Sequence, residues 1–229
     1  SAFAGILLYA DDIMLLAPTV TALQIMLVAC ELELKSIGMQ INVQKSACMR
    51  FGNRYDSPCS SIISLSGNTL KWVTSFKYLG IVIVSGKRFR CLFDACKNKF
   101  FGSFNAIFGR VGRFASEEVI LHLIRTKCLP VLLYAIEACP LLSRDIHSFE
   151  FVINRCLMKL FKTSSIVVVN ECCDFFGFTP IRLTIETRTV KFLERYISSE
   201  NIVCSCFARF ATAQLNGLRR ASAADMPVL

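Results

Sequence analysis

Short apolar runs dominate the first part of the chain. Residues 3–8 and 13–17 are two such runs, and the adjacent residues Asp11 and Asp12 interrupt them. Apolar runs of this length are typical of buried strands, and aspartate is favoured in tight turns. The pattern therefore predicts two buried strands joined by a turn that contains both aspartates.

The segment after this turn has the periodicity of an amphipathic helix. We expect Thr19 or Thr21 to be its N-cap and Gly38 to be its C-cap. The apolar face comprises Leu23, Met26 or Leu27, Cys30 and Leu34.

Residues 39–86 have a β-rich pattern. Residues 39–52 predict a strand pair or a strand and a turn. In residues 61–86 short β-rich runs alternate with Gly-Asn and Ser-Gly turn signals, which indicates β-hairpins.

The pattern becomes helical after Gly86. Further helices are expected to open at Ser116, at Ser143 and at Thr179-Pro180, where proline suits the first helical position, and the last should run to about Ile197. The first apolar stripe comprises Phe93, Cys96, Phe100, Phe104, Phe108 and Val111.

The sequence therefore predicts an α+β fold. Residues 1–86 should form β-hairpins with a packed helix, residues 87–210 an all-helical basic region, and residues 211–229 a tail.

The positive charge is concentrated in one segment. The formal net charge is +9, and the segment from Lys71 to Cys128 holds 11 Lys and Arg against 3 Asp and Glu. Lys99, Arg110 and Arg113 lie on an arc away from the apolar stripe of their helix. A concentrated positive field suits a polyanionic partner such as nucleic acid. The alternative is a solvated face that only keeps the protein soluble.

Hydropathy and cysteine content bear on localisation. The mean hydropathy of +0.51 is high, but the longest apolar run carries Glu137 and two prolines and is shorter than the roughly 20 residues that cross a bilayer. We therefore expect no membrane span. The 12 cysteines include no Cys-x-x-Cys pair, so reduced, mostly buried thiols are expected in an intracellular protein of the nucleus or cytoplasm that is not secreted.

Two adjacent carboxylates have a specific chemical use. They repel each other and raise each other's pKa unless a cation neutralises them. Mg²⁺ binds to one or two carboxylates together with substrate phosphates, and two such ions promote in-line displacement at phosphorus. The alternative for Asp11 and Asp12 is an ordinary exposed turn.

Three motifs in a fixed order carry a family resemblance. "YADD" (9–12), "GMQINVQKS" (38–46) and "FKYLG" (76–80) resemble three consecutive blocks of the palm of reverse transcriptases, most closely those of non-LTR retrotransposons of the LINE type. The helical remainder resembles their thumb and downstream region, so the resemblance covers roughly residues 1–200.

The resemblance implies an RNA-directed DNA polymerase that adds deoxynucleotides to a primer 3′ end on an RNA template. Mg²⁺, with Mn²⁺ as the alternative, would be its cofactor. By position, Asp11 matches the metal-binding aspartate, Asp12 its supporting neighbour, and Lys45 a lysine near the departing pyrophosphate. Tyr9 and Ala10 match residues near the primer end.

The third block implies a primer-holding hairpin that contains Phe76, Tyr78 and Gly80. Alternatives remain open for these positions. Lys45 is otherwise an exposed lysine at a strand end, and Phe76 and Tyr78 are otherwise ordinary core aromatics.

One departure from the family pattern matters. The family's metal site needs a further aspartate from an earlier strand, and residues 1–229 do not include that strand. We therefore interpret the chain as a C-terminal palm and thumb fragment that is inactive alone. The alternative is a truncated retroelement remnant that only binds nucleic acid. An RNA-dependent RNA polymerase is disfavoured by Ala10 and by the "FKYLG" block.

Overall fold

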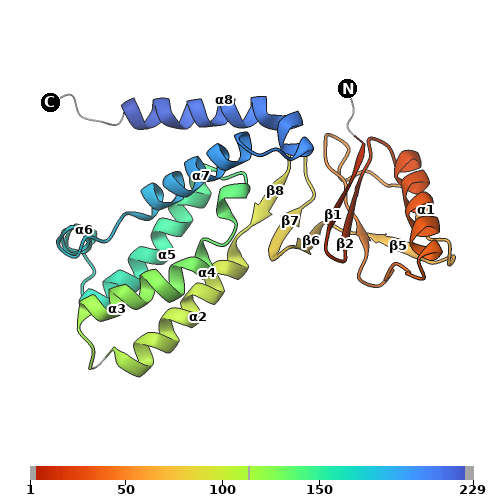
Figure 1. The fold of residues 1–229 in the computed structure, drawn as a ribbon. Coiled ribbons are helices and arrows are strands. Elements are labelled where there is room, and N and C mark those ends of the chain that lie inside the picture. The colour runs from red at the N-terminus through yellow and green to blue at the C-terminus, as the bar shows by residue number, and fades with distance from the viewer. Residues whose placement is uncertain (1–3, 113, 225–229) are drawn as a thin grey trace. The chain divides into compact units, whose positions relative to one another are not determined.

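The chain consists of two compact units, which comprise Ser1–Leu92 and Phe93–Leu229. The computed structural model describes residues 4–112 and 114–224 (Figure 1). Arg113, one of the candidate nucleic-acid-binding residues, lies outside the described residues. Among the described residues the first unit contains all the strands and one helix, and the second is helical, so the predicted α+β fold class is confirmed.

The first unit contains three small sheets. They follow the orders β1-β2, β3-β5-β4 and β6-β7-β8, and β3 and β5 are parallel whereas the other pairs are antiparallel. The elements are β1 (Gly5–Tyr9), β2 (Asp12–Leu16), α1 (Val20–Ser36), β3 (Ala47–Cys48), β4 (Ile62–Ile63), β5 (Thr69–Trp72), β6 (Ser75–Tyr78), β7 (Ile81–Val84) and β8 (Arg90–Leu92).

The N-cap of α1 is Thr19, as the sequence predicts, and its C-cap is Ile37, one residue before the predicted Gly38. The Thr19 hydroxyl accepts a hydrogen bond from the Ala22 amide at 3.1 Å. At the other end Gly38 has φ +74°, a left-handed conformation that glycine adopts without strain. The Met39 amide donates to the Leu34 carbonyl at 2.8 Å, which closes a Schellman-type turn one residue beyond the C-cap.

The core of the first unit lies between α1 and the sheet β3-β5-β4. Leu27 of α1 is buried with Cys48, Ile62 and Leu70, which belong to the three strands of that sheet. Leu15 of β2 packs against the same cluster, so this core also holds the base of the β1-β2 hairpin.

Two polar side chains of α1 bind the backbone near β4. The Gln24 side-chain amide donates to the Ile63 carbonyl at 2.7 Å and accepts from the Ile63 amide at 2.8 Å. The buried Glu31 carboxylate accepts from the Leu65 amide at 2.9 Å. These bonds fix the position of the helix along the sheet.

The prediction that β1 and β2 are buried is wrong. Leu8 is 70% exposed and Ile6 is 48% exposed. The strands form a two-stranded sheet, and partly buried Leu15 packs against the core cluster. An apolar run marks a fully buried strand only where both faces of the sheet are covered along their whole length. Ile6 lies opposite Leu15, which packs against the core, so the core covers only the base of this face and Leu8, nearer the turn, is left exposed.

The second unit contains helices throughout its described residues. They are α2 (Asp94–Val111), α3 (Glu117–Leu123), the π-helical turn η1 (Ile124–Cys128), α4 (Leu129–Leu132), the 3₁₀ turn η2 (Ile136–Ala138), α5 (Ser143–Phe161), α6 (Ile166–Phe175), α7 (Ile181–Ile197) and α8 (Ile202–Ala224). Ser116 caps α3 as predicted, because its hydroxyl accepts from the Val119 amide at 3.5 Å.

The predicted apolar stripe of α2 faces the core of this unit. Phe100 and Phe104 are fully buried, and Phe93 packs edge-to-face on Phe149 of α5 with ring centroids 5.3 Å apart. Edge-to-face aromatic pairs of this kind add about 0.5–1.5 kcal/mol to the burial of their area.

Residues 117–138 are long and apolar enough to cross a membrane, with a hydropathy of 1.7, although the sequence analysis expects no span. In the structure this segment is not one continuous helix. It contains a π-helical turn and Pro130, and Ala135 has φ +52°. Ile124 and Leu132 are buried inside the second unit, so packing in its core accounts for these apolar residues.

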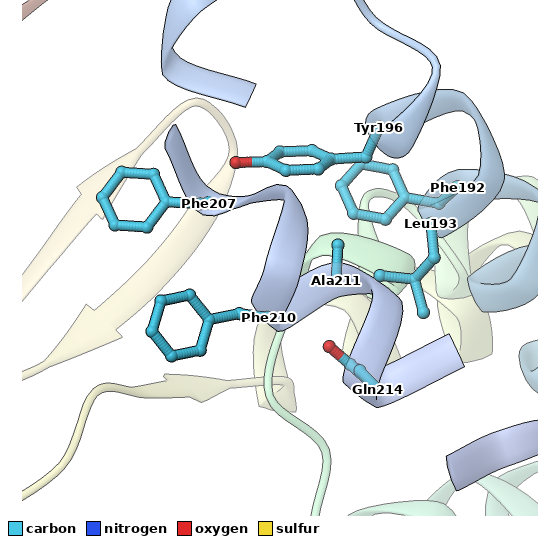
Figure 2. A pocket seen from close by; sticks show the side chains of 7 residues that line it. All are labelled: Phe192, Leu193, Tyr196, Phe207, Phe210, Ala211 and Gln214. Carbon is cyan, nitrogen blue, oxygen red and sulfur yellow. The ribbon is translucent and has the colours of Figure 1, made fainter. Parts of the chain in front are cut away.

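Helix α8 includes residues 211–224, which the sequence pattern assigns to a tail. Ala211 and Leu215 are buried against Leu193 of α7. An adjoining cavity has a volume of about 190 Å³, and Figure 2 shows the side chains that line it. Its lining comprises Phe192, Leu193, Tyr196, Phe207, Phe210, Ala211 and Gln214.

Candidate functional site

The two aspartates lie at the turn of the β1-β2 hairpin. Tyr9 pairs with Asp12, so Ala10 and Asp11 form a two-residue turn. Ala10 has a positive φ of +51°, whereas the φ of Asp11 is not positive. A positive φ at the first central residue alone is typical of a type II′ turn, where glycine is usual. Alanine there costs about 1–2 kcal/mol, and such strain is concentrated at functional sites.

Both carboxylates are available to a ligand. Asp11 and Asp12 are exposed, and neither side chain has a hydrogen bond or ion pair within residues 4–112 and 114–224. The turn is therefore held by backbone pairing of the strands. The carboxylates do not stabilise it.

The donor set fits Mg²⁺ in kind. Carboxylate oxygens are hard ligands, and Mg²⁺ commonly takes one or two of them and completes its octahedron with water and substrate phosphates. Among the residues that the structure describes, no group of three or more His, Cys, Asp or Glu side chains has the geometry to hold a metal ion. Asp11 and Asp12 thus supply part of a site.

Lys45 lies in a turn just before β3. Its amide donates to the side-chain oxygen of Asn42 at 3.1 Å, and the Ser46 hydroxyl donates to the Asn42 carbonyl at 2.8 Å. These bonds fix the backbone of the turn and leave the Lys45 side chain exposed. In the described part of the chain no hydrogen bond or ion pair joins Lys45 to either aspartate.

The "FKYLG" block forms the hairpin β6-β7. Tyr78 pairs with Ile81, so Leu79 and Gly80 form the turn. Both have positive φ, +45° and +85°, which is the pattern of a type I′ turn. Phe76 is 36% exposed and Tyr78 is half-buried. Gly80 is therefore required by the backbone of this turn.

Two of the candidate basic residues lie on α2. Lys99 and Arg110 are exposed, whereas the apolar stripe with Phe100 and Phe104 is buried. Neither cation has a carboxylate partner within the described residues. Lys97, by contrast, pairs with Asp94 at 3.0 Å. The charges of Lys99 and Arg110 thus remain available to a polyanion.

The sequence analysis missed a further cation beside this helix. Lys159 of α5 lies 4.9 Å from the centre of the Phe108 ring and donates to the Asn105 side chain at 3.1 Å. Only the three-dimensional packing of α5 on α2 reveals this pairing, because Lys159 is distant from both partners in sequence.

The cysteines are reduced thiols in the described part of the chain, and burial changes the acidity of several of them. Burial raises the pKa of Cys156 to about 12 and that of Cys48 to about 11. Among the described residues none of the twelve cysteines is in a disulfide, four are buried, and Cys206 is exposed. The buried thiols therefore stay protonated and unreactive near neutral pH.

Comparison with known protein families gives a match that lies within the first unit. Residues 4–83, about a third of the chain, match the family model described as reverse transcriptase (RNA-dependent DNA polymerase). This segment begins just before β1 and ends within β7, and it contains both hairpin turns. Among curated proteins and solved structures the comparisons found no match to the chain. The matched family supports an RNA-directed DNA polymerase as the class of this segment.

Proposed function

We propose that the chain is the palm and thumb part of an RNA-directed DNA polymerase of a non-LTR retrotransposon. The observation that carries this proposal is the strained turn at Ala10, which presents Asp11 and Asp12 to solvent inside the segment that matches the family. The intact enzyme would extend a DNA primer on an RNA template in retrotransposition, in the nucleus or the cytoplasm.

Asp11 is the proposed metal ligand and Asp12 its supporting neighbour. A divalent cation bound there, Mg²⁺ or Mn²⁺, supplies activation of the attacking 3′-hydroxyl and neutralisation of charge on the leaving pyrophosphate. The hairpin contributes position, because the two-residue turn that holds Asp11 is closed directly by the paired strands β1 and β2. Tyr9 and Ala10 adjoin the site and would contact the primer end.

Lys45 is the proposed general acid for the leaving pyrophosphate. Its exposed ammonium group has no carboxylate partner among the described residues. The Asn42 turn fixes its backbone but not its side chain. A cation that donates a proton as negative charge develops on the leaving group speeds the step.

The hairpin turn at Gly80 and the basic helix α2 are the proposed contacts to nucleic acid. Phe76 and Tyr78 would lie against the primer strand. Lys99 and Arg110, together with Arg113, would bind phosphates in a manner that does not depend on sequence.

The 229 residues alone are proposed not to polymerise. Asp11 and Asp12 are two carboxylates, and within the described residues no third acidic, His or Cys group joins them. The alternative is a remnant that only binds nucleic acid. The unpaired cations of α2 favour nucleic-acid binding in either case.

A fusion experiment tests the proposal. An upstream fingers and palm segment from a related polymerase is joined ahead of Ser1, and primer extension is measured with Mg²⁺. We expect extension by the fusion and background levels from the chain alone. Asp11→Asn should abolish extension, Asp12→Asn should reduce it less, and Lys45→Ala should slow turnover by about 10²–10⁴-fold.

Folding controls make the result interpretable. Because the Asp11 carboxylate has no partner among the described residues, Asp11→Asn should leave the free energy of unfolding unchanged. A fusion that extends primers equally well with Asp11→Asn would refute the catalytic assignment. A correctly folded fusion that binds primer but never extends it would favour the remnant.

A further inference from the structure

We propose that a cavity between α3, η1 and the end of α6 binds one unpaired base of a single-stranded nucleic acid, stacked on Phe175. This inference rests on the proposed function, because it assumes that the chain meets nucleic acid. It adds a second contact, which reads the base and not the phosphate.

The cavity combines aromatic and polar groups in a space large enough for a base. Its volume is about 330 Å³, which lies in the range of sites for small ligands. Its lining comprises Glu118, Leu121, His122, Arg125, Phe175 and Phe176. The polar groups come from α3 and η1, and the aromatic rings come from the end of α6 and the residue after it.

Phe175 is presented as a free stacking surface. It is 83% exposed, yet its ring is held edge-on to Phe176 with centroids 5.0 Å apart. Phe176 in turn stacks on Phe161 of α5 at 6.0 Å and 7°. The ring that meets solvent is therefore supported by two aromatic rings behind it. Exposed aromatic side chains are the usual platforms for unpaired bases.

Arg125 is fixed in place and keeps donors available. Its Nη2 donates to the carbonyls of Phe176 at 3.0 Å and Gly177 at 2.6 Å, and the guanidinium lies 5.2 Å from the centre of the Phe178 ring. Gly177 has φ +58°, which turns the chain after α6 so that these carbonyls are presented. Among the described residues Nη1 and Nε make no hydrogen bond.

The mixture of donors and acceptors favours a base over a phosphate. Glu118 contributes a carboxylate with no hydrogen bond or ion pair in the described part of the chain, and this charge would repel a phosphate. A base presents both N–H donors for Glu118 and carbonyl or ring-nitrogen acceptors for Arg125. Aromatic stacking with hydrogen bonds to the base edge is the general mode by which unpaired bases are recognised.

The test uses the full chain and an oligothymidylate that carries a single 2-aminopurine, whose fluorescence falls when the base stacks. We expect quenching on binding, and a duplex of the same length should quench less. Phe175→Ala should abolish the quenching and weaken binding by about 5- to 150-fold, the range expected for one stacked base. Phe175→Trp should retain both.

Phe151→Ala is the matched control. Phe151 is 63% exposed on α5 and does not line the cavity, so its removal should change neither quenching nor affinity. Circular dichroism checks that each variant folds.

The outcomes separate this inference from the proposed function. Salt-dependent binding without quenching, or quenching that survives Phe175→Ala, would overturn the base site and leave the proposed function standing. Absence of any binding to nucleic acid would overturn both.

Discussion

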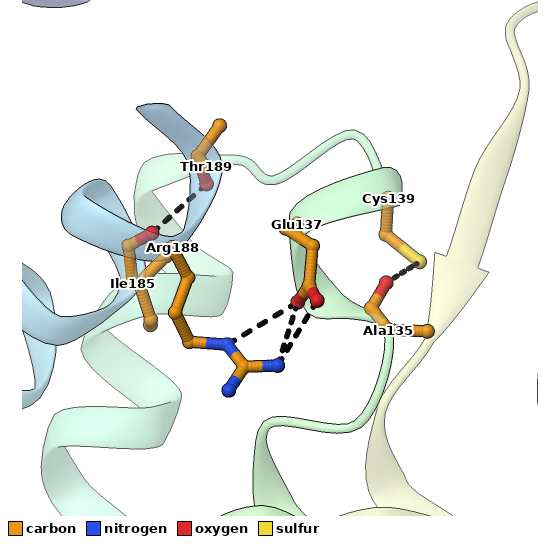
Figure 3. A network of polar contacts seen from close by, with 6 residues as sticks. All are labelled: Ala135, Glu137, Cys139, Ile185, Arg188 and Thr189. Carbon is orange, nitrogen blue, oxygen red and sulfur yellow. Dashed lines mark hydrogen bonds and ion pairs between the residues drawn. The ribbon is translucent and has the colours of Figure 1, made fainter. Parts of the chain in front are cut away.

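Arg188 of α7 and Glu137 of η2 form a bidentate ion pair (Figure 3). Arg188 Nη2 lies 3.0 Å from Glu137 Oε1, and Nε lies 3.3 Å from Oε2. The two side chains are 40% and 23% exposed. The pair joins two segments that are distant in sequence, and it closes the irregular stretch after α4 onto the helix α7.

Breaking this pair should destabilise the second unit. Removing one partner of a buried pair costs about 3–5 kcal/mol, whereas exposed pairs contribute at most about 1 kcal/mol. For this partly exposed pair we expect Arg188→Met to lower the free energy of unfolding by about 1–2 kcal/mol, measured by denaturation followed by circular dichroism. The control is Arg219→Met, because the Arg219–Glu194 pair is 59% and 46% exposed and its loss should cost less than about 0.5 kcal/mol. Equal effects of the two changes would contradict this ranking.

Leu79→Asn should stabilise the first unit. Leu79 has φ +45° in a type I′ turn, a position at which Asn-Gly is strongly preferred. Relief of this strain should raise the free energy of unfolding by about 0.5–1 kcal/mol. Trp72, the only tryptophan of the chain, reports unfolding of this unit by its fluorescence.

Substitution of the neighbouring residue Gly80 should destabilise the same turn. Gly80 has φ +85°, so Gly80→Ala should lower the free energy of unfolding by about 1 kcal/mol. If Leu79→Asn were destabilising while Gly80→Ala was neutral, the turn would not have the type I′ geometry.

Affinity for nucleic acid should depend on salt through α2. Each phosphate contact adds about −0.7 to −0.9 to the slope of log affinity against log salt concentration. Lys99→Ala with Arg110→Ala should therefore flatten the slope by about 1.4 to 1.8. Lys191→Ala is the control, because Lys191 is an exposed cation on α7 outside the basic segment. An unchanged slope in the double variant would show that these residues only solvate the surface.

The buried thiols should make the protein less stable in alkali. The pKa values of Cys48 and Cys156 are raised from 9.0 to about 11 and about 12 in the folded chain. The folded state then holds protons that the unfolded state loses, so stability is full below pH 9.0 and falls as pH rises toward these values. Denaturation at several pH values measures this slope, and Cys156→Ala should reduce it.

Reactivity toward an alkylating reagent provides an independent check. Cys206 is exposed and Cys156 is buried, so Cys206 should react first and Cys156 last in the native protein. Mass spectrometry of partly alkylated chains gives the order. Early labelling of Cys156 would contradict its burial.

The sequence predicted the structural features that depend on interactions between residues close together in the chain. Thr19 caps α1 because a short side-chain oxygen reaches the amides of the first turn. The residue after the C-cap has a positive φ, a conformation that glycine adopts easily, and Gly38 occupies this position. The buried positions Phe100 and Phe104 follow from helical spacing. Features that depend on contacts between distant residues could not be found in this way, and the Arg188–Glu137 pair is one of them.

In the candidate site, too, some features could be predicted from the sequence and others could not. The position of Asp11 in a hairpin turn was predictable, because a polar pair interrupts two apolar runs, whereas Asp12, expected in the same turn, is the first residue of β2 and pairs with Tyr9. The positive φ of Ala10 was not, since alanine gives no signal for a left-handed conformation. The exposure of Leu8 was also unpredictable, because it depends on which layer covers the sheet. The stacked support of Phe175 arises from α5 and α6 meeting in space.

The bonds between Gln24 and Ile63 have a consequence for association between molecules. Strand β4 is an edge strand of its sheet. The Gln24 side-chain amide makes hydrogen bonds with the Ile63 carbonyl and amide, with which a further strand would otherwise pair. Unpaired groups at a sheet border are templates on which other chains add strands and aggregate. The Gln24 side chain of α1 thus takes the place of a neighbouring strand at this edge, and it keeps β4 from pairing with a strand of a second molecule.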